Sequence, residues 1–213
     1  MSTIQTLADL LEQLGGIDPG RVRARPAPGT ATEQDAIAVR AQTGRLCELV
    51  DGVLVEKPTG FRKSCLAAAL IALLRGFVRP RNLGLVTAPD GMMRLAPQLV
   101  RIPDVAFLSW DRLPGRRVPD EPVPQLAPDL AVEVLSESNT PAEMARKRQE
   151  YFTAGVRLVW FIDPDARAVE VYTAPDQSTV LNEGETLDGG AVLPGLALPL
   201  SELFAELDLQ GNE

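Results

Sequence analysis

The chain has 213 residues, a formal net charge of −8 and no histidine. A protein that binds nucleic acid mainly by neutralising phosphates is basic, so the charge argues against that class, although an acidic metal site adds negative charge until its cation binds. The lack of histidine excludes Ser-His-Asp catalysis, Cys-His catalysis and histidine-ligated zinc. Catalysis therefore has to use carboxylates, Lys, Tyr, Ser or a cofactor.

Targeting signals and cysteine pairs are also missing. The apolar runs are shorter than the roughly 18–20 residues that cross a bilayer. The N-terminus has no basic region followed by the apolar stretch of a signal peptide. Cys47 and Cys65 do not have the spacing of a zinc site or a disulfide framework. We expect a cytoplasmic protein with reduced thiols and no membrane partner.

The first 43 residues predict an extension to the main domain. Thr3–Leu14 carries apolar side chains at helical spacing and is followed by two glycines. Residues 17–31 are rich in Pro, Gly and Arg, which is typical of a linker or an edge segment, and Thr32–Arg40 has the pattern of a second short helix. We therefore divide the chain into an extension at 1–43 and a domain at 44–213.

The first half of this domain predicts a hairpin, a helix and three extended segments. Asp51-Gly52 is a strong turn signal between two short apolar runs. Pro103 removes a ladder donor from a long extended stretch, so a bulge, a bend or an edge position is expected there. The predicted elements are strands at Leu46–Val50 and Val53–Glu56, a buried helix at Arg62–Val78, strands at Leu85–Thr87 and Met92–Leu95 joined by a turn, and the extended stretch Leu99–Ser109.

The second half continues with a loop, a strand, a helix and a further hairpin. Residues 111–128 hold five prolines and predict a loop. Thr140, Pro141 and Glu143 form a helix start, with Thr140 as N-cap and Glu143 closing a capping box. The predicted elements are a buried strand at Asp129–Ser136, a helix from Thr140 to Ala154, strands at Val156–Ile162 and Ala168–Thr173, short strands, and a helix at Leu200–Leu207. This order favours an α/β domain with a mixed sheet.

The strand at 129–134 carries the first candidate site residue. Side chains alternate across a strand, so the even-numbered Leu and Val residues form a core face, while Asp129, Ala131 and Glu133 point the other way. A sheet in an α/β domain is usually covered on both faces. An acid in mid-strand then costs several kcal/mol unless it is paired or binds a metal. The alternatives are an exposed polar face or an ion pair with an arginine.

Asp104 and Lys147 are two further charged residues at positions where the pattern predicts burial. Asp104 follows Pro103 and interrupts an apolar strand; the alternative is a bulge residue that caps its own backbone. Lys147 lies on the inward stripe of its helix because Met144 and Tyr151 stand at i−3 and i+4. A lysine there reaches a buried acid or extends along the core; the alternative is a surface pair with Glu143.

Together these residues favour a metal-dependent hydrolase. Two carboxylates on adjacent strands bind a divalent cation through hard oxygen ligands. The cation lowers the pKa of a bound water, and a nearby lysine stabilises charge that develops on a phosphate. The basic candidates for phosphate contact are Arg62, Lys63, Arg79, Arg81, Arg94 and Arg101.

Several segments, in their order, resemble the Uma-two family of restriction endonucleases, a branch of the PD-(D/E)XK nuclease superfamily. The resemblance covers about residues 44–206. It is carried by ELVDG at 48–52, RIPDVAF at 101–107, PDLAVEVLS at 128–136, KRQEY at 147–151, AGVRLVWFIDP at 154–164 and LPGLALPL at 193–200.

The resemblance implies a restriction-endonuclease-like mixed β-sheet flanked by helices, and DNA phosphodiester hydrolysis with Mg²⁺ or Mn²⁺. Asp104 is then the acid of the "PD" pair and Glu133 the acid of "(D/E)XK". The lysine of that motif would fall at Leu135, which is apolar, so the resemblance implies that Lys147 replaces it from the next helix. Glu48 becomes an accessory metal ligand, and Asp129 a weaker candidate.

Two other functions stay open at this point. The chain can be a catalytically inactive binding or regulatory module on a nuclease fold, or a hydrolase of a small phosphorylated substrate. Two coordinated cuts in DNA need two active sites, so a homodimer is also an expectation.

Overall fold

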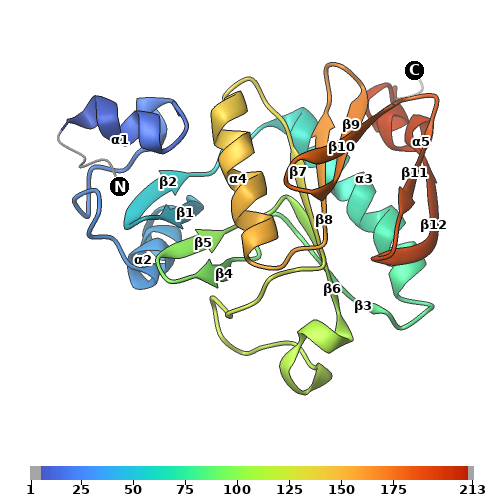
Figure 1. The fold of residues 1–213 in the computed structure, drawn as a ribbon, viewed down its shortest axis with the longest axis horizontal. Coiled ribbons are helices and arrows are strands. Elements are labelled where there is room, and N and C mark those ends of the chain that lie inside the picture. Colours follow the sequence, from blue (N-terminus) through green and yellow to red (C-terminus); the bar gives the residue numbers. More distant parts are fainter. Residues whose placement is uncertain (1–5, 211–213) are drawn as a thin grey trace.

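The computed structural model describes residues 6–210, which form two β-sheets side by side with helices around them (Figure 1). The helices are α1 (Leu7–Gln13), α2 (Glu33–Thr43), α3 (Phe61–Val78), α4 (Pro141–Thr153) and α5 (Leu200–Phe204). Short 3₁₀ turns lie at Pro19–Arg21, Trp110–Arg112, Pro114–Arg116 and Ala205–Leu207. None of the helices within 6–210 is both long and apolar enough to span a bilayer.

The larger sheet has six strands in the order β10-β9-β8-β7-β6-β3. Its β7–β8 pair is parallel and its other pairs are antiparallel, so the predicted mixed sheet is confirmed. The strands are β3 (Gly84–Thr87), β6 (Val105–Ser109), β7 (Leu130–Val134), β8 (Leu158–Asp163), β9 (Ala168–Ala174) and β10 (Gln177–Asn182).

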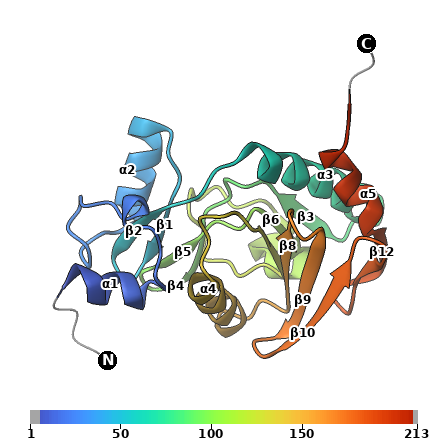
Figure 2. The same ribbon diagram turned by 90° about the horizontal axis from the view of Figure 1, so that it is seen from above.

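Helices cover the large sheet on both faces, as Figure 2 shows from above. On one face Leu130, Val132 and Val134 of β7 pack in the main core with α3 and α5. On the other face Ala131 packs with Met144 and Tyr151 of α4. The predicted alternation along β7 is therefore confirmed, and Glu133 points towards α4.

The smaller sheet has four strands in the order β2-β1-β5-β4. Its strands are β1 (Cys47–Val50), β2 (Val53–Glu56), β4 (Met93–Ala96) and β5 (Leu99–Arg101). Asp51 and Gly52 take φ angles of 51° and 73° at the β1–β2 turn, as the hairpin signal predicts. A two-stranded ribbon, β11 (Thr186–Gly189) with β12 (Leu193–Pro199), packs against the main core.

Two predicted connections differ in the tertiary structure. The stretch predicted at Leu99–Ser109 is two strands, because it bends at Pro103 and passes from the small sheet to the large one. The turn at Pro89 likewise joins β3 and β4 in different sheets rather than within one sheet. The bend at Pro103 is the expected result of a missing ladder donor. It places Asp104 where the two sheets meet.

The N-terminal segment packs on the small sheet. Leu10, Leu14 and Ile17 are buried against Val53 and Val55 of β2. Residues 3–5 of the predicted first helix lie outside the described residues, and the helix begins at Leu7 after the N-cap Thr6. The division at residue 43 stays a prediction.

Candidate functional site

Asp104 precedes β6 and is tied to β7 by backbone bonds. Its N–H donates to the Val132 carbonyl at 2.9 Å, and its Oδ2 accepts the Val134 N–H at 2.7 Å. The register pairs Val105 with Val132, so the next step of the ladder places Asp104 opposite Glu133. The Asp104 carboxylate thus accepts a backbone N–H of the neighbouring strand β7, as a strand carbonyl would. It does not cap its own backbone.

Two lysines bind the Asp104 carboxylate. The Lys57 Nζ lies 2.9 Å from Oδ1 and the Lys63 Nζ lies 2.8 Å from Oδ2. Burial raises the pKa of Asp104, but Lys57 and Lys63 outweigh it, so the pKa lies below its usual value. Asp104 is therefore an anion held between two ammonium groups.

Asp104 lines a cavity of about 600 Å³ that opens to solvent. Lys57 and Lys63 line the same cavity, together with Arg45, Glu56, Pro58, Thr59, Gly60 and Ser64. The Asp104 side chain is 1% exposed, whereas the Lys57 and Lys63 side chains are 4% and 9% exposed. A ligand that enters this cavity therefore meets the lysines before it reaches the acid.

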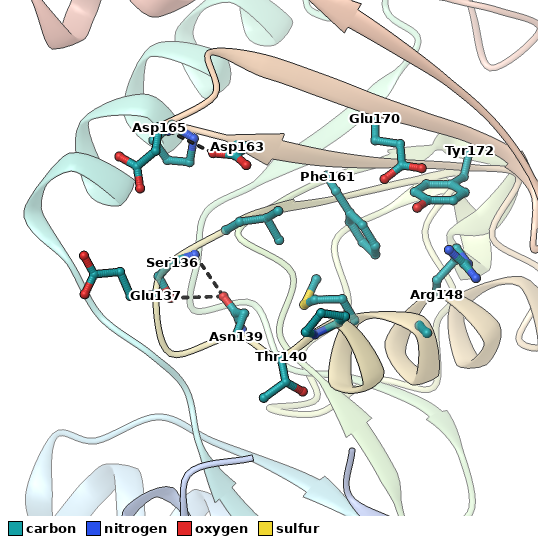
Figure 3. A pocket seen from close by; sticks show the side chains of 15 residues that line it. Ser136, Glu137, Asn139, Thr140, Arg148, Phe161, Asp163, Asp165, Glu170 and Tyr172 are labelled. Atoms are coloured by element: carbon teal, nitrogen blue, oxygen red, sulfur yellow. Dashed lines mark hydrogen bonds between the residues drawn. The ribbon is translucent and has the colours of Figure 1, made fainter. Parts of the chain in front are cut away.

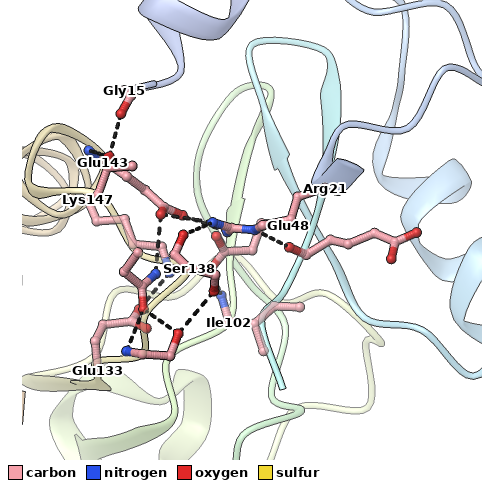
Figure 4. Close-up of polar contacts among 12 residues, drawn as sticks. Gly15, Arg21, Glu48, Ile102, Glu133, Ser138, Glu143 and Lys147 are labelled. Atoms are coloured by element: carbon pink, nitrogen blue, oxygen red, sulfur yellow. Dashed lines mark hydrogen bonds and ion pairs between the residues drawn. The ribbon is translucent and has the colours of Figure 1, made fainter. Parts of the chain in front are cut away.

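The other predicted acids form a second cluster under α4. Lys147 places its Nζ 3.0 Å from Glu133 Oε1 and 3.1 Å from Glu48 Oε1 (Figure 4). Glu48 comes from β1 in the small sheet and Glu133 from β7 in the large sheet, so Lys147 joins the two sheets. The predicted inward position of Lys147 is confirmed, and all three residues are at most 3% exposed.

Further donors complete this cluster. The Tyr151 hydroxyl donates to Glu133 Oε1 at 2.6 Å, and Arg101 donates to Glu48 Oε2 at 2.7 Å. Burial lowers the pKa of Lys147, but Glu133 and Glu48 outweigh it and raise the pKa above its usual value. Burial raises the pKa of Glu48, but Lys147 and Arg101 outweigh it, so the net shift is downward. The cluster is a buried network of charged groups joined by hydrogen bonds and ion pairs.

An ion pair and an N-cap hold the start of α4, the helix that carries Lys147. Glu143 accepts two bonds from Arg21, at 2.9 and 2.7 Å (Figure 4). The predicted capping box is wrong in its second half, because the Glu143 carboxylate binds Arg21 instead of closing the box; Thr140 does cap the helix by accepting from the Glu143 N–H. Glu143 is thereby engaged away from Lys147, so the predicted alternative pair with Lys147 does not form.

Asp129 stands apart from both clusters. Its carboxylate accepts bonds from Arg112, Arg157 and the Ser109 N–H at 2.7–3.1 Å. These contacts join β7 to the loop after β6 and to the start of β8. The structure therefore does not bring Asp129 to Asp104, Glu48 or Glu133.

The contacts of Asp104, Glu48 and Glu133 decide whether these acids can share a metal ion. Glu48 and Glu133 fit a cation between them, because they already share one in the Lys147 ammonium. Asp104 contacts Lys57 and Lys63 instead, and residues 6–210 contain no group of three or more acids or cysteines arranged to hold a metal ion. A divalent cation shared by Asp104 and Glu133 would need at least one ammonium group to move.

The chain matches a family profile over residues 33–201, described as "Putative restriction endonuclease" and named Uma2. The chain belongs to the Uma2 family. A crystal structure described as "a putative nuclease belonging to DUF820" from Anabaena variabilis has the same fold, with a TM-score of 0.69 and 20% identity. The similarity covers 78% of this chain and 93% of that chain. No curated protein matches the chain.

Membership of the Uma2 family confirms the predicted fold and supports a nuclease. Leu135, at the position of the superfamily lysine, is partly buried beside the α4 core cluster. It lines a second cavity of about 480 Å³ between α4 and strands β8 and β9, where the Arg148 guanidinium carbon lies 4.6 Å from the Tyr172 ring centre (Figure 3). This cavity does not contain Asp104 or Glu133.

The basic residues predicted to contact phosphate lie in different surroundings. Lys63 faces Asp104. Arg101 is buried between Glu48 and Glu150, and Arg94 pairs with Glu33. Arg62 pairs with the exposed Asp165, and the Arg81 guanidinium lies over the Phe77 ring. Lys63 is therefore the predicted phosphate contact that lines the Asp104 cavity.

The sequence interpretation missed Lys57, Tyr151 and the buried role of Arg101. One signal was available in the composition. The chain has 21 basic residues, and three of them, Lys57, Lys63 and Lys147, are lysines. All three bind candidate acids of the site. Lysine in an arginine-rich chain was thus a marker of the site.

Proposed function

We propose that this chain hydrolyses phosphodiester bonds in DNA at Asp104 and the adjoining Glu48–Glu133–Lys147 cluster. The observation that carries the proposal is the position of Asp104: an ionised, buried acid that lines an open cavity beside two lysines, on the strand next to Glu133. Buried acids and lysines that perturb one another in a cavity are a mark of functional sites. Family membership supplies the reaction class.

Each residue has a role that follows from its contacts. Lys57 and Lys63 would hold an anionic group in front of Asp104. Lys147 would act as a positioning residue that keeps Glu48 and Glu133 together, since its Nζ touches both carboxylates. Tyr151 would fix the Glu133 carboxylate through its hydroxyl.

The proposal includes dependence on Mg²⁺ or Mn²⁺, with Asp104, Glu133 and Glu48 as the ligands. When bound, such an ion lowers the pKa of a water and neutralises charge on the phosphate. The proposal also includes a homodimer for coordinated cuts, which light scattering of the purified protein would test.

The decisive experiment is a cleavage assay on single-stranded, duplex and supercoiled DNA with Mg²⁺, Mn²⁺ or EDTA. We expect cleavage by the wild type with metal, and a loss of at least about 100-fold in Asp104→Ala, because it removes a proposed metal ligand and even the loss of an outer-shell partner of such a ligand costs about 10–100-fold. Asp176→Asn, a change at an exposed acid in the β9–β10 turn, is the matched control and should keep full activity. Equal cleavage by wild type and Asp104→Ala would reject the site.

A second function has one observation in its favour. Asp104, Glu48 and Glu133 are each already bound to a lysine ammonium group, which suits a metal-free binding module. Calorimetric titration with Mg²⁺ separates the two. Heat of binding that is lost in Glu133→Gln supports the nuclease, whereas no binding at millimolar Mg²⁺ by the folded protein supports the binding module.

A further inference from the structure

The three lysines of the chain divide into two kinds. Lys57 and Lys63 line the open cavity over Asp104, and their side chains are 4% and 9% exposed. Lys147 is 1% exposed and its Nζ lies between two carboxylates. An incoming phosphate can exchange with Asp104 for the ammonium groups of Lys57 and Lys63. To reach Lys147 it would have to displace two buried acids.

The cavity favours an anion although the chain as a whole is acidic. Its charged lining consists of Arg45, Lys57 and Lys63 against Glu56 and Asp104, which leaves one positive charge in excess. A cleft with low-dielectric walls focuses such a charge and attracts a ligand of the opposite sign. A lysine ammonium is a compact charge with rotatable donors, which suits a phosphate that must move during a reaction.

An exposed aromatic residue stands next to this cavity. Phe61 begins α3 and is 87% exposed, the highest value among the exposed large hydrophobic residues of the described chain. It lines an adjoining cavity of about 430 Å³ together with Arg62, and the two cavities share Thr59, Gly60 and Lys63. An apolar ring exposed to water beside a cationic cavity suits a flat apolar partner that is joined to an anion.

We propose that residues 57–63 bind a nucleic acid strand, with Lys57 and Lys63 on a backbone phosphate in front of Asp104 and Phe61 stacked on an unpaired base of the same strand. The proposal rests on the proposed function and adds the substrate class: DNA with unpaired bases. Aromatic side chains stack on every type of base, because each base has a flat face. A fully paired duplex hides these faces, so it would use the lysines without the ring.

Binding of a fluorescein-labelled 12-nucleotide single strand, measured by anisotropy in EDTA so that no cleavage occurs, tests this element. We expect Lys63→Gln and Lys57→Gln to weaken binding about ten-fold at low salt and to reduce the slope of log affinity against log salt by about 0.7 each, as the loss of one phosphate contact predicts. We expect Phe61→Ala to weaken binding of the single strand about ten-fold and to leave a duplex of the same length unchanged.

Two controls match these variants. Arg75→Gln removes an exposed positive charge from the same helix, about 18 Å along its axis from Lys63. Val180→Ala removes an exposed apolar side chain, 56% exposed, on β10. Both should bind the single strand within two-fold of the wild type. An unchanged Phe61→Ala, or a wild type that binds duplex more tightly than single strand, would overturn the proposal.

Lysine signals give a second readout that does not depend on the stability of a variant. With ¹³C-lysine labelling, the wild-type protein shows three sets of lysine side-chain NMR signals, and Lys57→Arg and Lys63→Arg assign two of them. Titration with the unlabelled 12-mer should shift the Lys57 and Lys63 signals and leave the Lys147 signals in place. Shifts confined to Lys147, or binding without any lysine shift, would overturn the proposal, as would a failure of the 12-mer to bind.

The outcomes distinguish the proposed strand-binding site at residues 57–63 from the proposed nuclease activity. Cleavage by the wild type without NMR shifts at Lys57 and Lys63 rejects the strand-binding site and keeps the proposed nuclease activity. Binding at Lys57, Lys63 and Phe61 without cleavage in Mg²⁺ or Mn²⁺ supports the strand-binding site and rejects the proposed nuclease activity.

Discussion

Two lysine–acid clusters lie near each other and differ in what surrounds them. Asp104 with Lys57 and Lys63 forms an open cluster, because it lines a cavity that reaches solvent. Glu48 and Glu133 with Lys147 form a closed cluster, because α4 covers it and side-chain exposure is at most 3%. The same residue types thus serve two purposes: the open cluster is available to a ligand, and the closed cluster joins two sheets.

The closed cluster should contribute most to stability. Removing one partner of a buried ion pair leaves an uncompensated charge, which costs about 3–5 kcal/mol. In the open cluster two lysines bind one acid, so Asp104 keeps one ammonium partner when the other lysine is removed. The comparison therefore predicts large effects on unfolding for the closed cluster and large effects on binding for the open one.

Lys147→Met gives the largest expected effect. It leaves Glu48 and Glu133 without their shared cation, so the free energy of unfolding should fall by about 3–5 kcal/mol, as measured by urea denaturation. Lys63→Met, in the open cluster, should cost less because Lys57 still binds Asp104. An equal or larger loss in Lys63→Met would break the comparison.

Acidification should weaken both clusters. The folded-state pKa values of Glu48 and Asp104 are depressed, so their stabilisation is fully present above the unfolded values of about 4 and is lost as the pH falls through the folded values. Lys147 has the opposite sign: its raised pKa stabilises the fold below about pH 10.4, and this contribution is lost as the pH rises further. Urea midpoints from pH 2 to 11 measure the onset of both losses, and a Lys147→Met protein should lack the alkaline one.

Tyr151→Phe should have an intermediate effect. It deletes the hydroxyl that donates to Glu133 at 2.6 Å and keeps the ring in the core. A hydrogen bond to a charged group contributes about 1.5–3 kcal/mol, so the free energy of unfolding should fall by that amount. Phe152→Leu, a partly buried neighbour outside the cluster, is a control for packing changes on α4. Substitutions away from such contacts change the free energy of unfolding by up to about 0.5 kcal/mol. A loss below about 0.5 kcal/mol in Tyr151→Phe would therefore show that Lys147 alone is enough to stabilise the Glu133 carboxylate.

Arg62→Gln should have the smallest effect. Its ion pair with Asp165 joins side chains that are 60% and 69% exposed, so water screens the attraction. We expect a change in unfolding free energy within about 0.5 kcal/mol. A larger loss would mean that the ion pair at the adjoining 430 Å³ cavity, and not only the closed cluster, holds the fold together.

Local sequence signals determined the elements and the face that each acid occupies. Alternation at 129–134 placed Glu133 on the face that α4 covers, and Asp51-Gly52 specified a hairpin, because both depend on neighbouring residues. The helical spacing of Met144 and Tyr151 likewise placed Lys147 inward. The order of strands and helices, with the family resemblance, was enough to predict a mixed-sheet α/β fold.

Only the tertiary structure decided which charged groups meet. Pro103 predicted a bend, but not that the chain would pass between two sheets there. Glu143 binds Arg21 rather than its own helix end, because a segment distant in sequence brings a guanidinium to it. The same holds for the lysines: Lys147 binds Glu48 from the other sheet, and Lys57 reaches Asp104 from the end of β2. Contacts between distant segments depend on how the sheets pack, which a local pattern does not encode.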